Sequence, residues 1–254
     1  MSGRVKDLGN AALISLISDV FAGSGGRYGA RRVRAELGNR GIVANLKKVR
    51  RLMRLLGLRG RRVKRKYRSY MGTVGKVAEN LIGRDFAASG PDRKWATDVS
   101  EFAMAWGKCY LSPIKDMFTN EIIAWDLSLR PDFGQIARML EDAFRKHPDV
   151  KGLVLHSDQG WQYQMREYGR ALSDRGVIQS MSRKGNCLDN SIMESFFATM
   201  KVEMFYGHEA GFRTFGQFRD AVAEYIRWYN SERIQGKTKW MPPLRFREAS
   251  ICAV

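Results

Sequence analysis

The fold of this 254-residue chain is indicated most clearly by residues 153–160, LVLHSDQG, and residues 182–197, SRKGNCLDNSIMESFF. The first run is typical of a buried strand, and it ends in Asp158, where the backbone leaves the sheet. The second run is a loop followed by apolar residues at helical spacing, which places Glu194 on a helix. Together they predict one acid at a strand end and one on a helix, with 35 residues between them.

A third acid, Asp98, stands upstream in residues 95–102, which read WATDVSEF and have a strand pattern. An isolated aspartate is most often a helix cap or an ion-pair partner. A pair of divalent cations, however, requires several hard oxygen ligands. Three acids in strand, strand and helix contexts favour this chemistry, and we expect Asp98, Asp158 and Glu194 to be the catalytic and metal-binding residues.

These motifs resemble a known family. The Trp-x-x-Asp motif of residues 95–98, the DQGWQY motif of residues 158–163, the SMSRKGNCLDN motif of residues 180–190 and the 35-residue interval are similar to the DDE integrase core of retroviral-type integrases and bacterial transposases. More narrowly, they resemble the second-reading-frame (OrfB) transposase of the insertion-sequence-three family. The resemblance extends from about Tyr28 to the end of the chain.

The resemblance implies an α/β fold: a ribonuclease-H-like mixed sheet flanked by helices and preceded by a small all-α helix-turn-helix-like module. It implies a DNA transposase that cleaves and transfers strands at the ends of its element, with two Mg²⁺ ions for which Mn²⁺ can substitute. The expected partners are transposon-end and target DNA, further copies of the chain in a homo-oligomer on DNA, and an upstream-frame (OrfA) product or fusion.

Charge is distributed unevenly along the chain. The net charge is +18; residues 1–93 carry 22 Lys and Arg against 6 Asp and Glu, whereas residues 94–254 carry 22 against 20. This asymmetry indicates a front half that binds nucleic acid.

The sequence has no 18-residue apolar run and no signal-peptide pattern, so we expect no membrane association and a cytoplasmic, nucleoid-associated protein. The three cysteines and three histidines lack metal-ligand spacing, which argues against a zinc module.

Residues 1–60 predict a helical DNA-binding module. A short helix is expected over residues 11–22, followed by a basic helix from Arg27, a glycine-containing turn and a second basic helix from about Asn45. The alternative is a helical hairpin whose basic face is only solvated. The expected DNA contacts here are Arg31, Arg34, Lys47, Lys48 and Arg51.

Residues 61–90 predict a linker, because residues 59–68 hold seven basic residues in ten. Such a segment stays extended unless its charges are neutralised. It either follows a DNA backbone or is a free, solvated connection. The cations expected to contact DNA are Arg61, Arg62, Lys64 and Arg65.

Residues 91–254 predict the catalytic core with a helical tail. We expect antiparallel strands over 95–104, 108–117 and 121–128, and then a helix over 133–146, a strand over 152–156, a helix over 166–174 and a strand over 177–181. Pro113 conflicts with an ordinary central strand and requires an edge or a bulge. The tail carries a helical apolar stripe over 215–229 and then a segment similar to the family's C-terminal signature, although Pro242 departs from the usual Ser or Thr.

Further side chains near the acids have open roles. Lys201 follows Glu194 by seven residues, so the two should share a helix face about 10 Å apart; it either contacts a DNA phosphate or is a solvated lysine. Arg183 and Lys184 are also expected to contact DNA. Asp189 is expected to cap the helix of Glu194. Asp116 is expected to be structural, and His156 and Ser157 have either a structural or a substrate-binding role.

Two other functions compete with the transposase. One is a ribonuclease-H-like nuclease that only hydrolyses, and the other is a DNA-binding protein without catalysis. The basic front module and the tail favour the transposase over the first. The complete set of acids argues against the second.

Overall fold

The computed structural model describes residues 11–61, 77–183 and 187–252, except for the side chain of Cys187. Arg62, Lys64, Arg65 and Lys184 therefore lie outside the described residues. The chain divides into a helical unit, residues 1–64 with 232–242, and a sheet unit, residues 65–231 with 243–254. This division differs from the expected one, because residues 232–242 belong with the helical unit. The basic module is thus built from two distant parts of the chain.

Three helices form the described core of the helical unit: α2 (Ala11–Gly23), α3 (Ala30–Asn39) and α4 (Leu46–Leu55). Their apolar stripes face one another and are fully or nearly fully buried; they comprise Ile17, Val20, Val33, Leu37, Val49, Leu52 and Met53. The side chain of Asn45 accepts a hydrogen bond from the Lys47 N–H at 2.7 Å and so begins α4. The predicted helix, turn and second basic helix are confirmed.

Residues 232–242 complete this unit around the buried side chain of Tyr28. The Tyr28 hydroxyl accepts a hydrogen bond from the Ile234 N–H at 2.9 Å and donates one to the Glu232 carbonyl at 3.3 Å. At Gly60 the backbone passes so close to Gly29 that a Cβ at position 60 would overlap the Gly29 backbone. Only glycine fits at that crossing.

The sheet unit contains a six-stranded mixed sheet, in which β1 (Lys94–Thr97) and β2 (Ser100–Met104) both pair with β3 (Gly107–Asp116). On its other side β3 pairs with β4 (Ile122–Ser128). Beyond β1 lie β5 (Val154–Ser157) and β6 (Ile178–Met181), both parallel to their neighbour. The antiparallel strands followed by two parallel ones form the predicted α/β arrangement.

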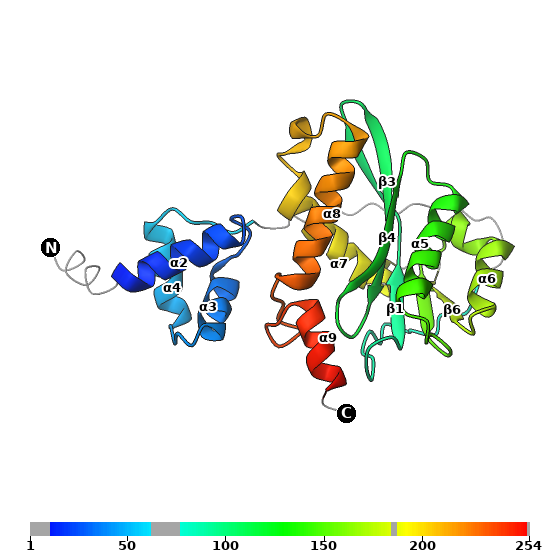
Figure 1. The fold of residues 1–254 in the computed structure, drawn as a ribbon, viewed down its shortest axis with the longest axis horizontal. Helices are drawn as coiled ribbons and strands as arrows, with labels where there is room; N and C mark the ends of the chain where they lie inside the picture. Colours follow the sequence, from blue (N-terminus) through cyan, green and yellow to red (C-terminus); the bar gives the residue numbers. More distant parts are fainter. Residues whose placement is uncertain (1–10, 62–76, 184–186, 253–254) are drawn as a thin grey trace. The chain divides into compact units, whose positions relative to one another are not determined.

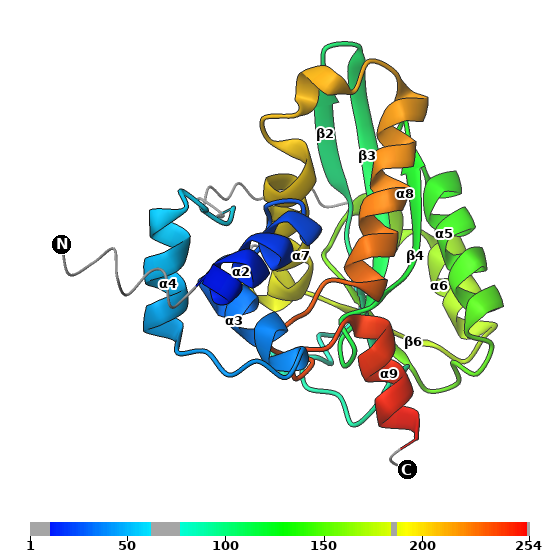
Figure 2. The same cartoon turned by 60° about the vertical axis from the view of Figure 1, so that its left-hand side comes forward.

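Helices cover both faces of the sheet (Figures 1 and 2). α5 (Phe133–Lys146) and α6 (Arg166–Ser173) pack on one face, around a core that includes Trp95, Ile114 and Leu155. α7 (Ser191–Met200) and α8 (Phe215–Ser231) cover the other face, where the Phe196 and Tyr229 rings meet edge to face at 5.3 Å. α9 (Pro243–Ile251) follows. Among the described residues no helix has the length and apolar character needed to cross a membrane.

The predicted strand 95–104 is in fact two strands, because the pairing is interrupted at Asp98 and Val99. The register is continuous on both sides: Thr97 pairs with Ile114 and Ser100 with Leu111, so Asp98 lies opposite Pro113. Proline has no N–H to donate to the ladder, and the Asp98 side chain accepts the Val99 N–H at 2.8 Å. Pro113 is therefore accommodated in β3 because the strand that faces it is interrupted between β1 and β2. Asp98 lies at this interruption.

Candidate active site

Two of the predicted acids lie side by side at one edge of the sheet. β1 and β5 run parallel with Ala96 opposite His156, so Asp98 and Asp158 each follow the carboxyl end of their strand at equivalent positions. The Asp158 carboxylate accepts the Gly160 N–H at 2.8 Å, as Asp98 accepts that of Val99. Each of these bonds uses one carboxylate oxygen and fixes the side chain, and the second oxygen remains available to a ligand.

Glu194 comes from the first turn of α7, which packs against β1. Its neighbours on the inner face of the helix, Met193, Phe196 and Phe197, are buried, whereas Glu194 itself is half-buried. The apolar spacing that predicted this helix thus also sets the direction of the acid. The structure brings Glu194 within electrostatic range of Asp98.

The acids disfavour one another's ionised forms. Burial raises the pKa of Asp98 well above its usual value, and the charges of Asp158 and Glu194 raise it further, while the Val99 N–H and the Lys201 ammonium oppose the shift. Burial also raises the pKa of Asp158, and its hydrogen bond from Gly160 opposes this. Like charges in a poorly solvated site have this effect.

The donor set fits a divalent cation. Carboxylate oxygens are hard ligands, and a bound cation balances the repulsion that raises the pKa of Asp98. Across the part of the chain that the structure describes, no three His, Cys, Asp or Glu side chains are already close enough together to form a ready-made metal site. Asp98 and Asp158 lie at one edge of the sheet, and Glu194 lies on α7, which packs against β1.

Lys201 lies beside this site rather than in solvent. It opens a π-helical turn, Lys201–Phe205, that continues α7. Its Nζ donates to the Glu101 carbonyl at 3.0 Å and stands 4.8 Å above the Phe102 ring. Burial lowers the pKa of Lys201, while the charges of Glu101 and Asp98 oppose that shift. The side chain extends along β2 toward the first acid.

Asp189 does not cap α7, contrary to the expectation. The residue preceding the helix is Asn190, and its side chain makes no capping hydrogen bond. The Asp189 carboxylate is fully buried and accepts hydrogen bonds from Asn80, Arg84 and Arg183. Its three cationic or amide partners outcompete the helix N–H groups, and they lower the pKa of Asp189, led by Arg183. No local pattern signals this role, because Asn80 and Arg84 are more than 100 residues away.

Arg183 is therefore engaged as well. Its Nε and Nη2 lie 2.9 and 3.0 Å from the two Asp189 oxygens, although its side chain remains exposed. The expected contact between Arg183 and DNA stays a prediction. If Arg183 makes this contact, it does so with a guanidinium group whose orientation is fixed by Asp189.

His156 and Asp116 have structural surroundings. Both ring nitrogens of His156 are occupied, Nδ1 by the Ser180 hydroxyl at 2.9 Å and Nε2 by the Asp189 carbonyl at 3.0 Å. Burial lowers the pKa of His156, which favours the neutral form of the ring. Asp116 accepts the N–H groups of Phe118 and Thr119 in the turn after β3. The structural role expected for Asp116 agrees with these contacts.

The cations predicted to bind DNA in the helical unit lie on its surface. Arg31 and Arg34 are on α3 and Lys47, Lys48 and Arg51 on α4, and all five are exposed, as is Arg61. Arg34 also donates to the Ala44 carbonyl at 3.3 Å, which ties α3 to the turn. The arrangement presents positive charge to solvent from two successive helices.

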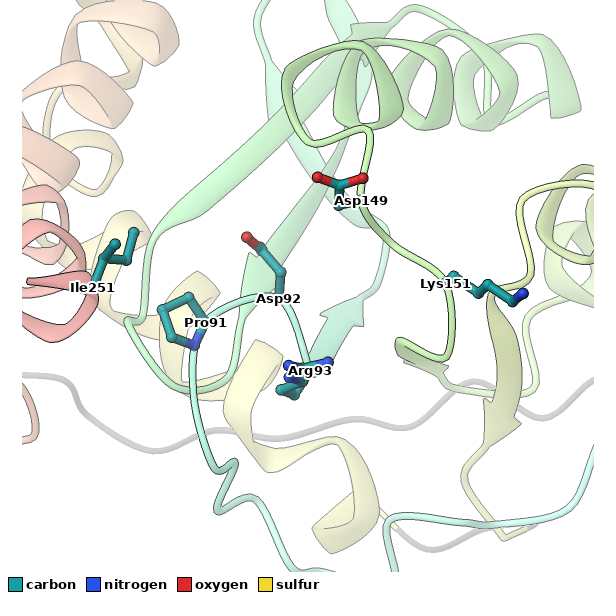
Figure 3. Close-up of a pocket in the computed structure, with 6 residues that line it drawn as sticks. All are labelled: Pro91, Asp92, Arg93, Asp149, Lys151 and Ile251. Atoms are coloured by element: carbon teal, nitrogen blue, oxygen red, sulfur yellow. The ribbon is translucent and has the colours of Figure 1, made fainter. Parts of the chain in front are cut away.

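A pocket of about 450 Å³ lies away from the acids (Figure 3). Pro91, Asp92, Arg93, Asp149, Lys151 and Ile251 line it. Asp92 and Arg93 precede β1, whereas Asp98 follows it, so the pocket is at the opposite end of that strand. The Asp92 carboxylate is bound by His147 at 3.1 Å and by Arg247 of α9 at 2.6 Å. The ion pair between Arg247 and Asp92 fastens α9 to the segment before β1.

Known families match most of the chain. Residues 9–67 match the HTH-like domain, and residues 88–187 and 194–251 match two families described as integrase core domain. A putative transposase, InsK, for insertion sequence element IS150 of Escherichia coli is 48% identical over 91% of this chain and 81% of the relative. An uncharacterized transposase-like protein of Haemophilus influenzae is 54% identical over 69% of this chain and 80% of the relative. The transposase for insertion sequence element IS904 of Lactococcus lactis is 34% identical over 91% and 92%, respectively.

Solved structures share the fold at low identity. The HTLV-2 integrase catalytic core domain in complex with magnesium has a TM-score of 0.52 at 12% identity, covering 63% of this chain and 99% of that one. The simian T-cell lymphotropic virus intasome in complex with a PP2A regulatory subunit has a TM-score of 0.55 at 12% identity, covering 84% and 70%. The expected ribonuclease-H-like fold is confirmed.

Proposed function

This chain belongs to the insertion-sequence-three family of DNA transposases, enzymes that cleave and transfer DNA strands, and we propose that Asp98, Asp158 and Glu194 carry out its reaction with Mg²⁺. The observation that carries the proposal is the pairing of β1 with β5. It sets two carboxylates at equivalent positions after adjacent parallel strands, with Glu194 brought to them by α7.

The three carboxylates would hold a pair of divalent cations. When bound, such a pair activates the attacking oxygen and stabilises the leaving 3′-oxygen of a phosphodiester. Mg²⁺ suits an all-oxygen donor set that leaves room for water and phosphate, and Mn²⁺ has similar ligand preferences. The Val99 and Gly160 N–H groups orient Asp98 and Asp158 by occupying one oxygen of each.

Lys201 would position the DNA. Its ammonium group is anchored by the Glu101 carbonyl and the Phe102 ring, and it interacts electrostatically with Asp98. From there it can reach a phosphate next to the one attacked, where a charge-assisted hydrogen bond both binds and orients. This assignment keeps Lys201 outside the metal ligand set.

The helical unit would supply affinity for DNA. Its exposed cations on α3 and α4 fit contacts to phosphates, which fix the position of a protein on a duplex. Further contacts to DNA phosphates are proposed for Arg61, Arg62, Lys64 and Arg65 and for Arg183 and Lys184. The partners are transposon-end and target DNA, other copies of the chain on that DNA, and an upstream-frame (OrfA) product or fusion.

The test is a cleavage and joining assay on a duplex that ends in the element's inverted repeat. With the full chain and Mg²⁺ we expect nicking followed by strand transfer, and no product in chelator. Nicks without joined product at any protein concentration would instead favour the hydrolytic nuclease. Binding without nicking in either Mg²⁺ or Mn²⁺ would refute the catalytic assignment. Addition of the OrfA product to parallel reactions would show whether it is required for joining.

A further inference from the structure

Residues 77–85, here called the strap, run along the outer edge of β6. The backbone N–H of Met181 donates to the Glu79 carbonyl at 3.2 Å, and the Leu81 N–H donates to the Ser180 hydroxyl at 3.0 Å. Ile82 is 3% exposed and anchors the strap in the unit. In the sequence the strap follows the basic linker. It therefore joins the DNA-binding half of the chain to the sheet next to the active site.

One route from the strap to the active site passes through the side chain of Asp189. Asn80 Nδ2 lies 2.8 Å from one of its oxygens and Arg84 Nε 3.1 Å from the other. Arg84 adopts a φ of 70°, in the left-handed region that residues other than glycine rarely occupy. That turn directs its guanidinium at a carboxylate that is fully buried. A buried carboxylate depends strongly on its partners, because without them its burial is unfavourable.

A second route reaches the same residue through His156. The Ser180 hydroxyl accepts the Leu81 N–H, so its own hydrogen is directed to His156 Nδ1 at 2.9 Å. The neutral ring then carries its proton on Nε2 and donates it to the Asp189 carbonyl at 3.0 Å. The Ser182 hydroxyl also lies 3.2 Å from Nε2, where it can share that proton while it donates to the Ser157 carbonyl. These contacts link the strap, β6, β5 and Asp189 in one chain of hydrogen bonds.

Both routes end at the entry to α7. Asp189 is two residues before Ser191, the first residue of that helix, and Glu194 lies in its first turn. Asp189 lies in the 3₁₀ turn Cys187–Asn190, which leads directly into α7, so a displacement of Asp189 alters the start of the helix that carries Glu194. Arg183 binds Asp189 from the neighbouring loop, and the other two side chains that hold its carboxylate, Asn80 and Arg84, come from the strap, more than 100 residues earlier in the chain.

We propose that the strap is a positioning element for the active site, which sets Glu194 relative to Asp98 and Asp158 through Asp189. Arg84, Asn80, Ser180 and His156 are its positioning residues, and none of them is required to touch DNA or metal. Release of the strap would loosen the first turn of α7 and leave the two strand acids in place. The proposal rests on the assignment of Glu194 to the reaction.

The experiment compares two variants of the full chain. Asn80→Ala with Arg84→Gly removes both strap ligands of Asp189, and glycine accepts the left-handed backbone at position 84 without strain. Arg138→Ala is the matched control, because Arg138 also pairs through Nε and Nη2 with a carboxylate, that of Asp126, on a distant surface. Amide exchange of residues 189–196 is followed without metal, and cleavage is titrated with Mg²⁺.

We expect exchange in residues 189–196 to accelerate about tenfold for each of the two hydrogen bonds to a charged group that the strap variant removes, or about a hundredfold in all. The Mg²⁺ concentration for half-maximal cleavage should rise by a similar factor, with DNA affinity unchanged. The control should match the wild type in both. Ser180→Ala, which breaks the second route alone, should shift both readouts in the same direction.

Equal exchange in the strap variant and the control would overturn the proposal, and so would faster exchange without a change in Mg²⁺ dependence. Because exchange requires no activity, its result stands even for a preparation that does not cleave. A wild type that binds DNA but never cleaves it would refute the proposed function instead, so the two failures are distinguishable.

Discussion

The two units of this chain place charge in opposite ways. In the helical unit, cations such as Arg31, Lys47 and Lys48 stand in solvent on two successive helices. In the sheet unit, charged groups such as Asp116 and Asp189 are fully buried and bound by several donors. Exposed charges act together and are screened by salt, whereas a buried charge acts on its immediate neighbours and is hardly screened.

This difference predicts how each unit responds to substitution. Each surface cation should contribute a small, salt-dependent share of DNA affinity. Removal of one half-buried acid from the active site should instead change the chemistry outright, because no neighbour replaces a metal ligand. The expected effects therefore range from the acids, where they are largest, to a single hydroxyl group, where they are smallest.

The largest effect is expected at the acids. Asp98→Asn, Asp158→Asn and Glu194→Gln each keep the shape of the side chain and remove a ligand charge. Cleavage and joining should fall about 10³-fold or more, since metal ligation contributes several kcal/mol to the transition state. Single-turnover assays on an inverted-repeat duplex measure the loss, and fluorescence anisotropy measures binding.

DNA affinity should remain near that of the wild type in all three variants. Asp126→Asn, which removes a carboxylate paired with Arg138, is the control and should cleave normally. Wild-type cleavage by any one acid variant would remove that residue from the site and weaken the contrast between the units.

The next effect concerns the basic face. Replacement of Arg31, Lys47 and Lys48 by Gln in the full chain should weaken DNA binding at all sequences alike. The slope of log affinity against log salt should become shallower by about 0.9 for each phosphate that the variant no longer neutralises. Titrations between 50 and 200 mM salt give the slope, a range over which six to ten phosphate contacts change affinity by ~10³–10⁵.

The matched control replaces three cations of the sheet unit by Gln, so that the net charge of the chain changes by the same amount. Arg145, Arg166 and Arg175 are exposed on α5, α6 and the turn after α6, and their joint replacement by Gln should leave the slope unchanged. Equal slopes for both triple variants would show that the basic helical face makes no special contribution.

A smaller effect is expected at Lys201, a predicted DNA contact that stands next to the acids. Lys201→Ala should reduce strand joining about tenfold, the contribution of one charge-assisted hydrogen bond to phosphate, while DNA affinity stays within about twofold. Joining is measured at saturating Mg²⁺, so a change in metal affinity does not enter. Lys108, exposed on β3, gives the control Lys108→Ala. Joining equal to that of the control would leave Lys201 a purely structural side chain.

The smallest effect tests how the helical unit is held together. Tyr28→Phe leaves the buried Ile234 N–H without its acceptor, which should cost the unit about 1–2 kcal/mol of stability. Amide exchange of residues 28–37 and 232–242 should accelerate together, while that of β3 and β5 stays unchanged. Tyr206→Phe, at an exposed tyrosine, is the control. Faster amide exchange in only one of these two segments would contradict the conclusion that both belong to the helical unit.

Local sequence patterns identified the candidate acids, and together with the family resemblance that these motifs carry they indicated the class of fold. Asp98 and Asp158 each end a short apolar run, and Glu194 falls within a helical apolar stripe, so periodicity placed each on its element. The helix over 133–146 was predicted with the same bounds as α5. Such features follow from interactions between residues close in the chain, and the spacing of apolar residues is enough to predict them.

Other features exist only in the folded chain. The break between β1 and β2 depends on Pro113 in the neighbouring strand, and the membership of residues 232–242 in the helical unit depends on Tyr28, some 200 residues earlier. Asp189 looked like a cap because its nearest N–H groups belong to a helix, but its partners Asn80 and Arg84 come from the strap, more than 100 residues away. A buried polar group takes the partners that the completed fold brings to it, and no local pattern contains them.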